Sequence, residues 1–336
     1  MENRQGQYLG IANAGASVHV LVICRSSHNC KKVCLRFQKV SCLERFGGNG
    51  FSIEEMLKLC AIDESRLGAA ENMLSKGFPS RSRAFWRRGL RRLADQNRAV
   101  GQPSVGFFLL ADEAPVGILL TISRHDMETG RRIVNFSSWY VEESHRWSAA
   151  RLIIAGLADK DAIYTDLPPT PAAVEINSRL GFRSIGFDLS LVALPWLALV
   201  GPRQGRLRPL EAVPTGVLAE ALLQDLRNHQ KLGCIVVSVE IDGHYHPIVL
   251  SVTSRKYIPA ARIVFAESMD IVVNNLGSLA RLLVRRGVPI LALQVEQGRN
   301  APHAWIWKRG LCYQVKGEWN DRAINELYSE RVLLKM

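Results

Sequence analysis

The residues whose types and spacing best suit chemistry lie in one stretch, NFSSWYVEESHRWSAARLII, which runs from Asn135 to Ile154. Up to Val141 it is rich in aromatic and branched residues, which is typical of a strand, and from Ser144 it becomes small and helix-forming around Arg146. A helix N-terminus presents unpaired N–H groups and a partial positive charge to an anion. Small residues let the backbone approach a phosphate, and a basic residue adds charge. The pattern therefore predicts a strand, an acidic turn and a helix whose first turn holds a phosphate group.

A second interpretation of this turn needs no ligand. Arg146 follows Glu142 and Glu143 closely enough to form a surface salt bridge with either carboxylate. The stretch is then an ordinary connection between a strand and a helix.

The charge of the chain also favours an anionic partner. The formal net charge is +12, and seven arginines face one acid, Asp95, in RSRAFWRRGLRRLADQNR (81–98). One interpretation is the solvated face of an amphipathic helix whose inward residues are Phe85, Trp86, Leu90 and Leu93. The other is a polyanion-binding surface. Because no helix-turn-helix, zinc-finger or aromatic stacking pattern accompanies the charge, nucleic acid is the disfavoured partner.

Cysteine usage and apolar runs give no sign of a metal site or a membrane segment. Four of the seven cysteines, Cys24, Cys30, Cys34 and Cys42, lie near His28, but only one short spacing occurs among them, so we predict no metal. The apolar run LSLVALPWLALV (189–200) is too short to span a bilayer, and we expect no secretory signal. A cytoplasmic protein without a membrane partner is the expectation.

The elements that must position the predicted phosphate-binding turn begin near Met56. The sequence predicts a strand in MLKLCAID, a helix in ESRLGAAENMLSKGF, the arginine-rich helix and a hairpin in VGFFLLADEAPVGILLTISRH. The strand RRIVNFSSWYV then leads into the turn, and a helix, the strand AIYTD, a short helix and a strand from Arg183 follow. This order indicates an α/β (α+β) fold with a mixed, mainly antiparallel twisted sheet flanked by helices.

A similar order begins again after GPRQGRLRPL (201–210), whose composition is typical of a linker. We therefore predict two units of one architecture, residues 55–203 and residues 206–336, as a long-period repeat. Residues 1–54 lack sustained periodicity and end near GGNG. They are predicted to be an N-terminal extension, either flexible or translated from upstream sequence with Met56 as the natural start.

Three pieces of the first unit resemble the GCN5-related N-acetyltransferase (GNAT) superfamily over residues 55–200. The hairpin with PVG (115–117) is similar to the family's second and third strands, and SSWYVEESHRWSAARLI is similar to its fourth strand and following helix. TPAAVEINSRLGFRSIGF is similar to its closing segment, in which a helix ends in Leu-Gly-Phe. The resemblance implies a fourth strand that splays from its neighbour, an acyl-CoA arm in the gap, and a pyrophosphate on the start of the following helix.

Carried onto this sequence, the resemblance implies acetyl-CoA or another acyl-CoA as cofactor. The cofactor-binding residues that it implies are Tyr140, Val141, Arg146, Trp147, Ser148, Ala149 and Ala150. Two positions depart from the family pattern: Arg151 stands where the second glycine is expected, and Trp147 stands where glycine is frequent.

The catalytic residues that the resemblance implies are less regular. Asn177 stands where the family commonly has a tyrosine that protonates the leaving thiolate, and Asn cannot act as an acid at neutral pH. Tyr140 and Tyr164 are the substitutes that we predict, although each also suits core packing with a satisfied hydroxyl. A base could be supplied at the strand ends, where the sequence places Glu142, Glu143, His145 and Asp166.

The second unit has no basic residue where Arg146 stands in the first. VVNNLGSLARLL provides Asn275 or Ser278 as a helix cap, and we predict a degenerate copy that completes a wall of the substrate site.

These features predict an acyl-CoA-dependent N-acyltransferase that acts on an amine of a small molecule, peptide or protein. Asn177 and Arg151 favour a rival, a non-catalytic CoA-binding or scaffold protein of the same fold. A basic nucleic-acid-binding protein is the third interpretation, supported by charge alone. A homodimer is compatible with the sequence.

Overall fold

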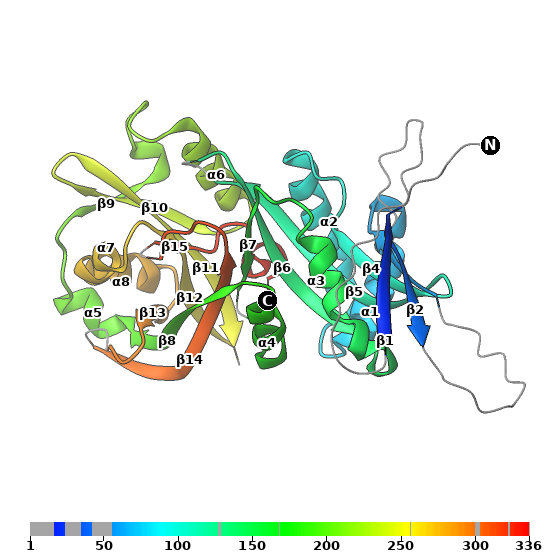
Figure 1. Cartoon of the computed structure of the whole chain (residues 1–336). Coiled ribbons are helices and arrows are strands. Elements are labelled where there is room, and N and C mark those ends of the chain that lie inside the picture. The colour runs from blue at the N-terminus through cyan, green and yellow to red at the C-terminus, as the bar shows by residue number, and fades with distance from the viewer. Residues whose placement is uncertain are drawn as a thin grey trace, which may run out of the picture. The chain divides into compact units, whose positions relative to one another are not determined.

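The chain forms two compact units (Figure 1). The computed structural model describes residues 17–23, 35–41, 56–126, 129–167, 169–255, 257–299, 303–321 and 323–335, the first two ranges as backbone only. The first unit comprises Met1–Thr121 and Ser138–Lys160, and the second comprises Ile122–Ser137 and Asp161–Met336. Two long strands, β5 (Ala114–His125) and β6 (Arg132–Val141), pass from one unit into the other.

The predicted domain limits follow the repeat of element order, and the ranges 55–203 and 206–336 stay a prediction. Within the predicted extension 1–54, the structure describes two strands, β1 (Ser17–Ile23) and β2 (Leu35–Ser41), which pair antiparallel. The four clustered cysteines and His28 lie outside the described residues.

The first unit is built on an antiparallel sheet with the strand order β1-β2-β3-β4-β5. Its further elements are β3 (Leu57–Ala61), η1 (Glu64–Arg66), α1 (Leu67–Gly77), α2 (Arg83–Ala99), β4 (Gly106–Ala111), η2 (Glu143–Ser148) and α3 (Ala150–Gly156). The predicted hairpin is confirmed, and its turn residues Asp112 and Glu113 have positive φ angles of 46° and 69°. Two residues with φ > 0 form the turn type whose twist matches that of paired strands.

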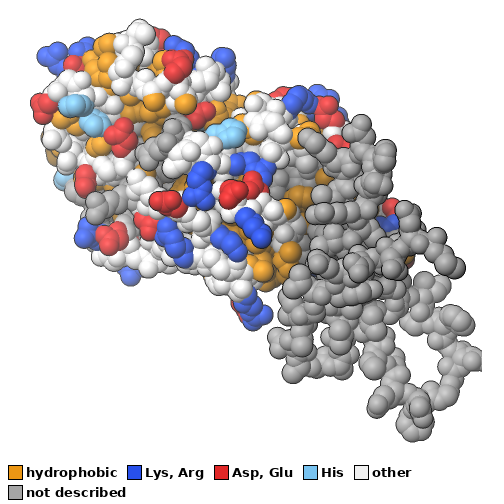
Figure 2. Space-filling view, turned by 45° about the horizontal axis from the view of Figure 1, so that its top comes forward, with side chains coloured by type: hydrophobic (Ala, Val, Ile, Leu, Met, Phe, Trp, Pro, Cys, Tyr) orange, Lys and Arg blue, Asp and Glu red, His pale blue; other side chains and the backbone are white. Residues whose placement is uncertain are grey.

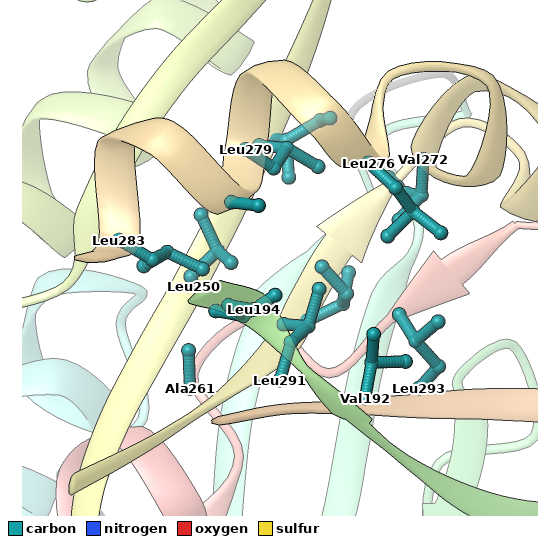
Figure 3. Close-up of a cluster of buried hydrophobic side chains, with 14 of the residues drawn as sticks. Val192, Leu194, Leu250, Ala261, Val272, Leu276, Leu279, Leu283, Leu291 and Leu293 are labelled. Carbon is teal, nitrogen blue, oxygen red and sulfur yellow. The ribbon is translucent and has the colours of Figure 1, made fainter. Parts of the chain in front are cut away.

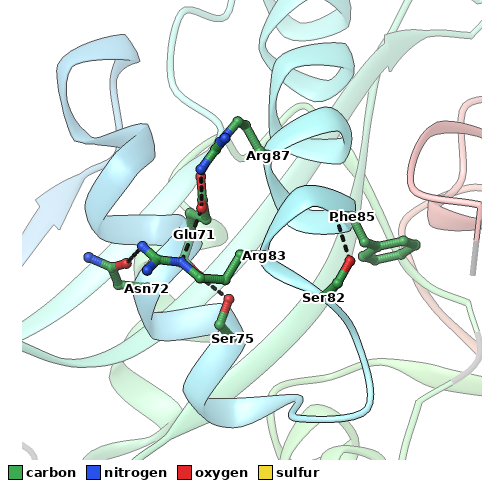
Figure 4. A network of polar contacts seen from close by, with 7 residues as sticks. All are labelled: Glu71, Asn72, Ser75, Ser82, Arg83, Phe85 and Arg87. Carbon is green, nitrogen blue, oxygen red and sulfur yellow. Dashed lines mark hydrogen bonds and ion pairs between the residues drawn. The ribbon is translucent and has the colours of Figure 1, made fainter.

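The arginine-rich segment folds as the amphipathic helix that the sequence predicts. Trp86, Leu90 and Leu93 are buried on one face of α2, while Phe85 is partly buried. Ser82 begins the helix, because its hydroxyl accepts a hydrogen bond from the backbone N–H of Phe85 (Figure 4).

A neighbouring face of α2 is joined to α1 by a buried carboxylate. Glu71 of α1 accepts hydrogen bonds from Arg87 at 2.9 and 3.0 Å and from Arg83 at 3.3 Å (Figure 4). The hydrogen bond from Arg87 is the main cause that holds the pKa of Glu71 below its usual value, against burial. Two of the seven arginines therefore share one carboxylate within the unit.

The second unit is a mixed sheet with the strand order β6-β7-β14-β8-β13-β12-β11-β10-β9, and β15 pairs with β12. Its strands after β6 are β7 (Ile163–Asp166), β8 (Arg183–Ala193), β9 (Arg206–Pro209), β10 (Ile235–Ile241), β11 (His244–Arg255), β12 (Ile258–Ala266), β13 (Ile290–Glu296), β14 (Ala304–Lys316) and β15 (Ile324–Asn325). Its helices are α4 (Pro171–Arg179), α5 (Leu194–Val200), η3 (Leu210–Ala212), α6 (Glu220–Lys231), α7 (Met269–Asn274), α8 (Leu276–Arg285) and α9 (Glu330–Leu333).

The predicted repeat of element order is present in the structure. Along the chain, β9, α6, β10, β11, β12, α8, β13 and β14 occur in the same order as β3, α2, β4, β5, β6, α3, β7 and β8. Helices α1 and α4 of the first series and α7 of the second have no counterpart in this order. In both series the only parallel pair joins the fourth and fifth strands, β6–β7 and β12–β13, among the ladders described. The sixth strands are exchanged: β14 lies between β7 and β8, and β8 lies between β14 and β13.

A large apolar core holds the C-terminal half of the second unit together (Figure 3). One face of α8 contributes Leu276, Leu279 and Leu283, at helical spacing, against Leu250 and Leu291 of the sheet. Helix α5 can reach α8 because two glycines meet there. A Cβ added to Gly277 would lie 2.3 Å from the carbonyl oxygen of Gly201.

Candidate functional site

The predicted turn follows β6, which extends beyond its ladder with the parallel strand β7. The β6–β7 ladder joins Ile133–Phe136 to Ile163–Asp166, and β6 then continues to Val141. Ser138 interrupts the strand with a φ of 47°, which is uncommon for a residue other than glycine and marks a local irregularity. The last residues of β6 therefore form no ladder with β7.

The helix predicted from Ser144 is built differently. Residues Glu143–Ser148 form the 3₁₀ helix η2, and the α-helix α3 begins only at Ala150 and has seven residues. The N–H groups of His145 and Ala149 already donate to the carbonyls of Glu142 and Arg146, at 2.9 and 3.1 Å. The helix expected through Ala149–Leu157 is therefore present as α3, whereas the turn around Arg146 that precedes it is a 3₁₀ helix and uses part of the predicted donor set internally.

The small residues of the turn are buried rather than exposed to a ligand. Ser148 is 2 % exposed and its hydroxyl donates to the carbonyl of His145 at 2.7 Å, and Ala149 is also buried. Ala150 is half-buried. The Ser148 hydroxyl thus stabilises the turn itself.

Two arginines lie near the turn, Arg146 exposed within it and Arg151 half-buried at the start of α3. The Arg146 side chain is 67 % exposed and contacts Glu143 at 3.9 Å, the longer limit of a salt bridge. Glu142 pairs instead with Lys76 at 2.7 Å. Arg151 lies with its guanidinium 5.4 Å from the centre of the exposed Trp147 ring. Two guanidinium groups and an indole thus share this turn.

Tyr140 and Val141 pack into the first unit. The Tyr140 ring lies against Gly77 at the end of α1, where an added Cβ would come 2.4 Å from the ring, and 6.3 Å from the Phe78 ring. Val141 contacts Gly117, because a Cβ there would lie 3.1 Å from its Cγ2. A larger residue at Gly117 of the PVG motif would therefore crowd Val141.

Asp166 and Asn177 meet in the second unit. Asn177, fully buried on α4, donates from Nδ2 to Oδ2 of Asp166 at 2.9 Å. The pKa of Asp166 is raised to about 7, mainly by burial and to a smaller degree by the charge of Glu330, while the Asn177 hydrogen bond acts in the opposite direction. Asp166 is also the residue at which the β6–β7 ladder ends. A carboxyl group that titrates near neutral pH suits acid–base chemistry.

The other two predicted residues have different surroundings. Tyr164 is 3 % exposed, and its ring lies 5.7 Å from that of Phe136, which in turn lies 5.9 Å from Phe182. The ring of Tyr164 thus belongs to an aromatic cluster of the core. Tyr140 and the cofactor candidates belong to the first unit, whereas Tyr164, Asp166 and Asn177 belong to the second.

Glu330 is a candidate that the sequence did not single out. Its Oε2 accepts a hydrogen bond from the hydroxyl of Ser137 on β6 at 2.6 Å, across 193 positions of the chain. Through its charge it also raises the pKa of Asp166. No local pattern around SERVLL marks it, because only the fold of the second unit brings α9 to β6.

Solved structures of the GCN5-related N-acetyltransferase class share this architecture. One, from Anabaena variabilis, superposes with a TM-score of 0.53 at 10% identity, over 77% of this chain and 72% of its own. The GCN5-related glucosamine N-acetyltransferase region of a fungal multi-domain GH3 β-N-acetylglucosaminidase gives 0.54 at 11% identity, over 78% of this chain and 38% of its own. The chain has the GCN5-related N-acetyltransferase fold. No family model and no curated protein matches its sequence.

In terms of the GCN5-related N-acetyltransferase fold, β6 and β7 are the fourth and fifth strands of the first series, and β12 and β13 are those of the second. The β12–β13 ladder joins only Ala260–Arg262 to Ile290–Ala292. Beyond it, Phe265 and Ala266 of β12 pair with β15, and the N–H of Glu326 donates to the carbonyl of Val264 at 2.7 Å. The chain's own segment therefore occupies this edge of β12.

A buried charge cluster fixes that segment. Glu326, 1 % exposed, pairs with Arg262 at 2.8 Å and with Arg331 at 3.0 Å, and Tyr313 and Gln294 also donate to it. Burial acts to raise the pKa of Glu326, but the two arginines hold it below its usual value. Removing one partner of a buried pair leaves an uncompensated charge, so this edge is held firmly.

A cavity of about 450 Å³ remains beside β15 and the end of β12. Its acidic walls are largely paired: Glu318 contacts Arg131 at 3.5 Å, and Glu267 contacts His246 at 2.7 Å. His246 of β11 thus has a carboxylate partner, Glu267, at the end of β12.

The described part of the chain contains no group of three or more His, Cys, Asp or Glu side chains that could hold a metal ion. No helix among the described residues is both long and apolar enough to cross a membrane.

Proposed function

We propose that the protein is an acyl-CoA-dependent N-acyltransferase, which moves an acyl group from acetyl-CoA or another acyl-CoA to an amine. The observation that carries this proposal is the end of the β6–β7 ladder at Phe136 and Asp166, where β6 runs on and Asp166 has a pKa of about 7. The fold supports the same assignment, because a parallel pair that separates in this way is where the fold's cofactor would insert.

The residues of β6 and its turn fit an acyl-CoA for a chemical reason. The main chain at Tyr140 and Val141 lies beyond the β7 ladder, and exposed Arg146 with the Arg151–Trp147 pair provides cations for phosphates. Because the 3₁₀ turn uses part of its own N–H groups, the side-chain cations carry a larger share of anion binding than a helix start would require.

The proposed chemistry centres on the Asp166 carboxylate. An acyl-CoA supplies the acyl group as a thioester when bound. Asp166 receives the proton that the amine loses as the new C–N bond forms, and Asn177 holds the carboxylate through its Nδ2–H. The thiolate leaves as the C–S bond breaks. Tyr140 and Tyr164 remain proposed acids for it, although both rings are packed against neighbours.

The decisive experiment measures free-thiol release from acetyl-CoA and longer acyl-CoAs with a panel of amines. Asp166→Asn should lower kcat about 100-fold or more and remove the rise of kcat/KM with pH near 7. Glu175→Gln, on the exposed face of the same helix as Asn177, should leave both unchanged. Turnover in Asp166→Asn with an unaltered pH profile would rule out Asp166 as the base.

A non-catalytic CoA-binding protein of the same fold is the second candidate. Asn177 at the position of the usual acid favours it, since an amide donates no proton at neutral pH. A Tm that rises with acyl-CoA, without thiol release from any amine, would select this candidate. Absence of both effects would exclude the two functions together.

Nucleic acid remains the disfavoured partner. Arg83 and Arg87 are paired with Glu71, and Arg98 contacts Glu64 and Asp95. On the face seen in Figure 2, Lys and Arg side chains are interspersed with Asp and Glu.

A further inference from the structure

The second unit buries a guanidinium without a matching carboxylate. Arg124, near the end of β5, is 4 % exposed, and its Nη1 has no hydrogen-bond partner among the described residues. Asp225 and Asp126 act on it only through space, and burial still lowers its pKa to about 10. The Trp319 ring is a further neighbour, and its centre lies 6.0 Å from the guanidinium carbon. A buried charge left in this way is costly unless something pairs with it.

Arg124 lines a small cavity with a second unused donor. Asn135 of β6 is 6 % exposed and lines the same cavity. Its Oδ1 accepts a hydrogen bond from the Thr165 hydroxyl at 3.0 Å, which fixes the amide, and its Nδ2 has no partner in the described structure. Two buried N–H donors from two strands therefore face one space. Polar groups of this kind are nearly always satisfied, so an occupant is expected.

The size and charge of the space select the occupant. The cavity measures about 10 Å³, room for roughly one particle of the size of water. A water molecule would satisfy the donors but leave the guanidinium charge uncompensated, whereas a monoatomic anion does both. A halide is smaller than phosphate, sulfate or a carboxylate, so it suits this small space best.

We propose that this cavity binds a halide ion, chloride in solution, held by Arg124 and Asn135. Asn325 lines the same cavity, and its Oδ1 also lacks a partner among the described residues. Because the two ends of an amide are interchangeable by rotation, Asn325 supplies its NH₂ as a third donor to the anion.

A halide here joins segments that are far apart in sequence. It links β5 and β6 to residues 325–328 of the C-terminal segment, where Leu327 and Tyr328 complete the walls. That segment leads directly to Glu330, which contacts Ser137. Halide binding therefore stabilises the C-terminal segment, whether or not the protein transfers acyl groups.

The first test compares thermal unfolding in sodium chloride and bromide with sodium sulfate and gluconate at equal ionic strength. The Tm should rise with halide concentration and level off, beyond the effect of the other salts. Arg124→Gln should abolish the halide-specific rise, while Arg88→Gln, on the exposed face of α2, should retain it. An equal response of wild type to all four salts would overturn the proposal.

The second test does not depend on the stability of a variant. Crystals grown in bromide should show an anomalous peak at the position between Arg124 Nη1 and Asn135 Nδ2. Asn135→Asp, which keeps the side-chain size but adds a repelling carboxylate, should remove both the peak and the Tm response. A water molecule in the cavity, or bromide at surface positions only, would refute the halide site.

Discussion

Asp166 makes the stability of the protein depend on pH near neutrality. Its folded pKa of about 7 lies above the usual 3.8, so its contribution to stability is fully present below pH 3.8 and is lost as pH rises through 7. Asp166→Asn removes this loss. As the pH rises from 5 to 8, the stability of the variant relative to wild type should increase by on the order of 2 kcal/mol. Urea unfolding of both proteins at the two pH values measures the difference. A constant difference would mean that Asp166 titrates normally.

His229 makes the stability of the protein depend on pH in the opposite direction. It is fully buried, its Nδ1 donates to the carbonyl of Asp225 at 2.7 Å, and its Nε2 accepts from the N–H of Tyr328 at 3.1 Å. Burial lowers its pKa to about 4 from the usual 6.5, so its contribution is present above pH 6.5 and is lost as pH falls through 4. By pH 4 the loss should approach about 3 kcal/mol. Near pH 5 the effects of His229 and Asp166 therefore oppose each other.

His229→Gln tests this group separately. The variant should be less stable than wild type at pH 7.5, because the acceptor for the Tyr328 N–H is disturbed, and the deficit should shrink between pH 7 and pH 4.5. Guanidinium unfolding followed by far-UV circular dichroism gives both values. A deficit that stays the same at every pH would show that His229 is protonated normally in the folded state.

At the level of single residues, the sequence located part of the candidate site. Asp166 was predictable as a polar residue at a strand end, but its altered pKa was not, because the burial that causes it is a property of the assembled sheet. Glu330 was not predictable, since its contact with Ser137 spans 193 positions. The position of Asn177 was predictable from the Leu-Gly-Phe motif, while its bond to Asp166 required the structure.

At the scale of elements, residue types predicted the order of strands and helices but not the form of every turn. The segment after β6 has a helix-forming composition, yet η2 is a 3₁₀ helix, since α and 3₁₀ helices use the same residues and differ in hydrogen bonding. The amphipathic α2 was predictable, because its apolar residues recur at helical spacing.

The α1–α2 pair provides an element-scale prediction. Glu71 is 6 % exposed and accepts from both Arg83 and Arg87, whereas Glu64 forms an exposed pair with Arg98. Glu71→Gln should lower the free energy of unfolding by about 1–2 kcal/mol, because a buried acceptor of charged hydrogen bonds is lost. Glu64→Gln, the matched exposed control, should cost at most about 0.5 kcal/mol. Chemical denaturation of the two variants compares them, and equal losses would show that burial of Glu71 adds nothing.

At the scale of the whole molecule, the repeat was predictable and the exchange of strands was not. The two series of elements have the same order, which the sequence pattern contains. Strands β8 and β14 are apolar enough to pair with several neighbours, so the pattern does not say that β14 pairs with both β7 and β8. The exchange of strands links the predicted ranges 55–203 and 206–336, which the repeat alone did not indicate.

Because of this exchange, the first series of elements depends on β14, the last long strand. Residues 1–205 on their own lack β14, which pairs with Tyr164–Asp166 of β7 and with β8 from Arg183 to Val192. β7 would then keep only its ladder with β6, and β8 would lose both of its ladders, to β14 and to β13. Strands with unpaired backbone groups are unstable in water. We expect this fragment to be insoluble or to exchange the amide hydrogens of β7 and β8 rapidly. A full-length chain cut within residues 201–205 is the matched control, because it retains every strand and should stay assembled with slow exchange. Cooperative unfolding of the 1–205 fragment, with β7 and β8 protected, would show that the exchanged strand is dispensable and that each predicted domain folds alone.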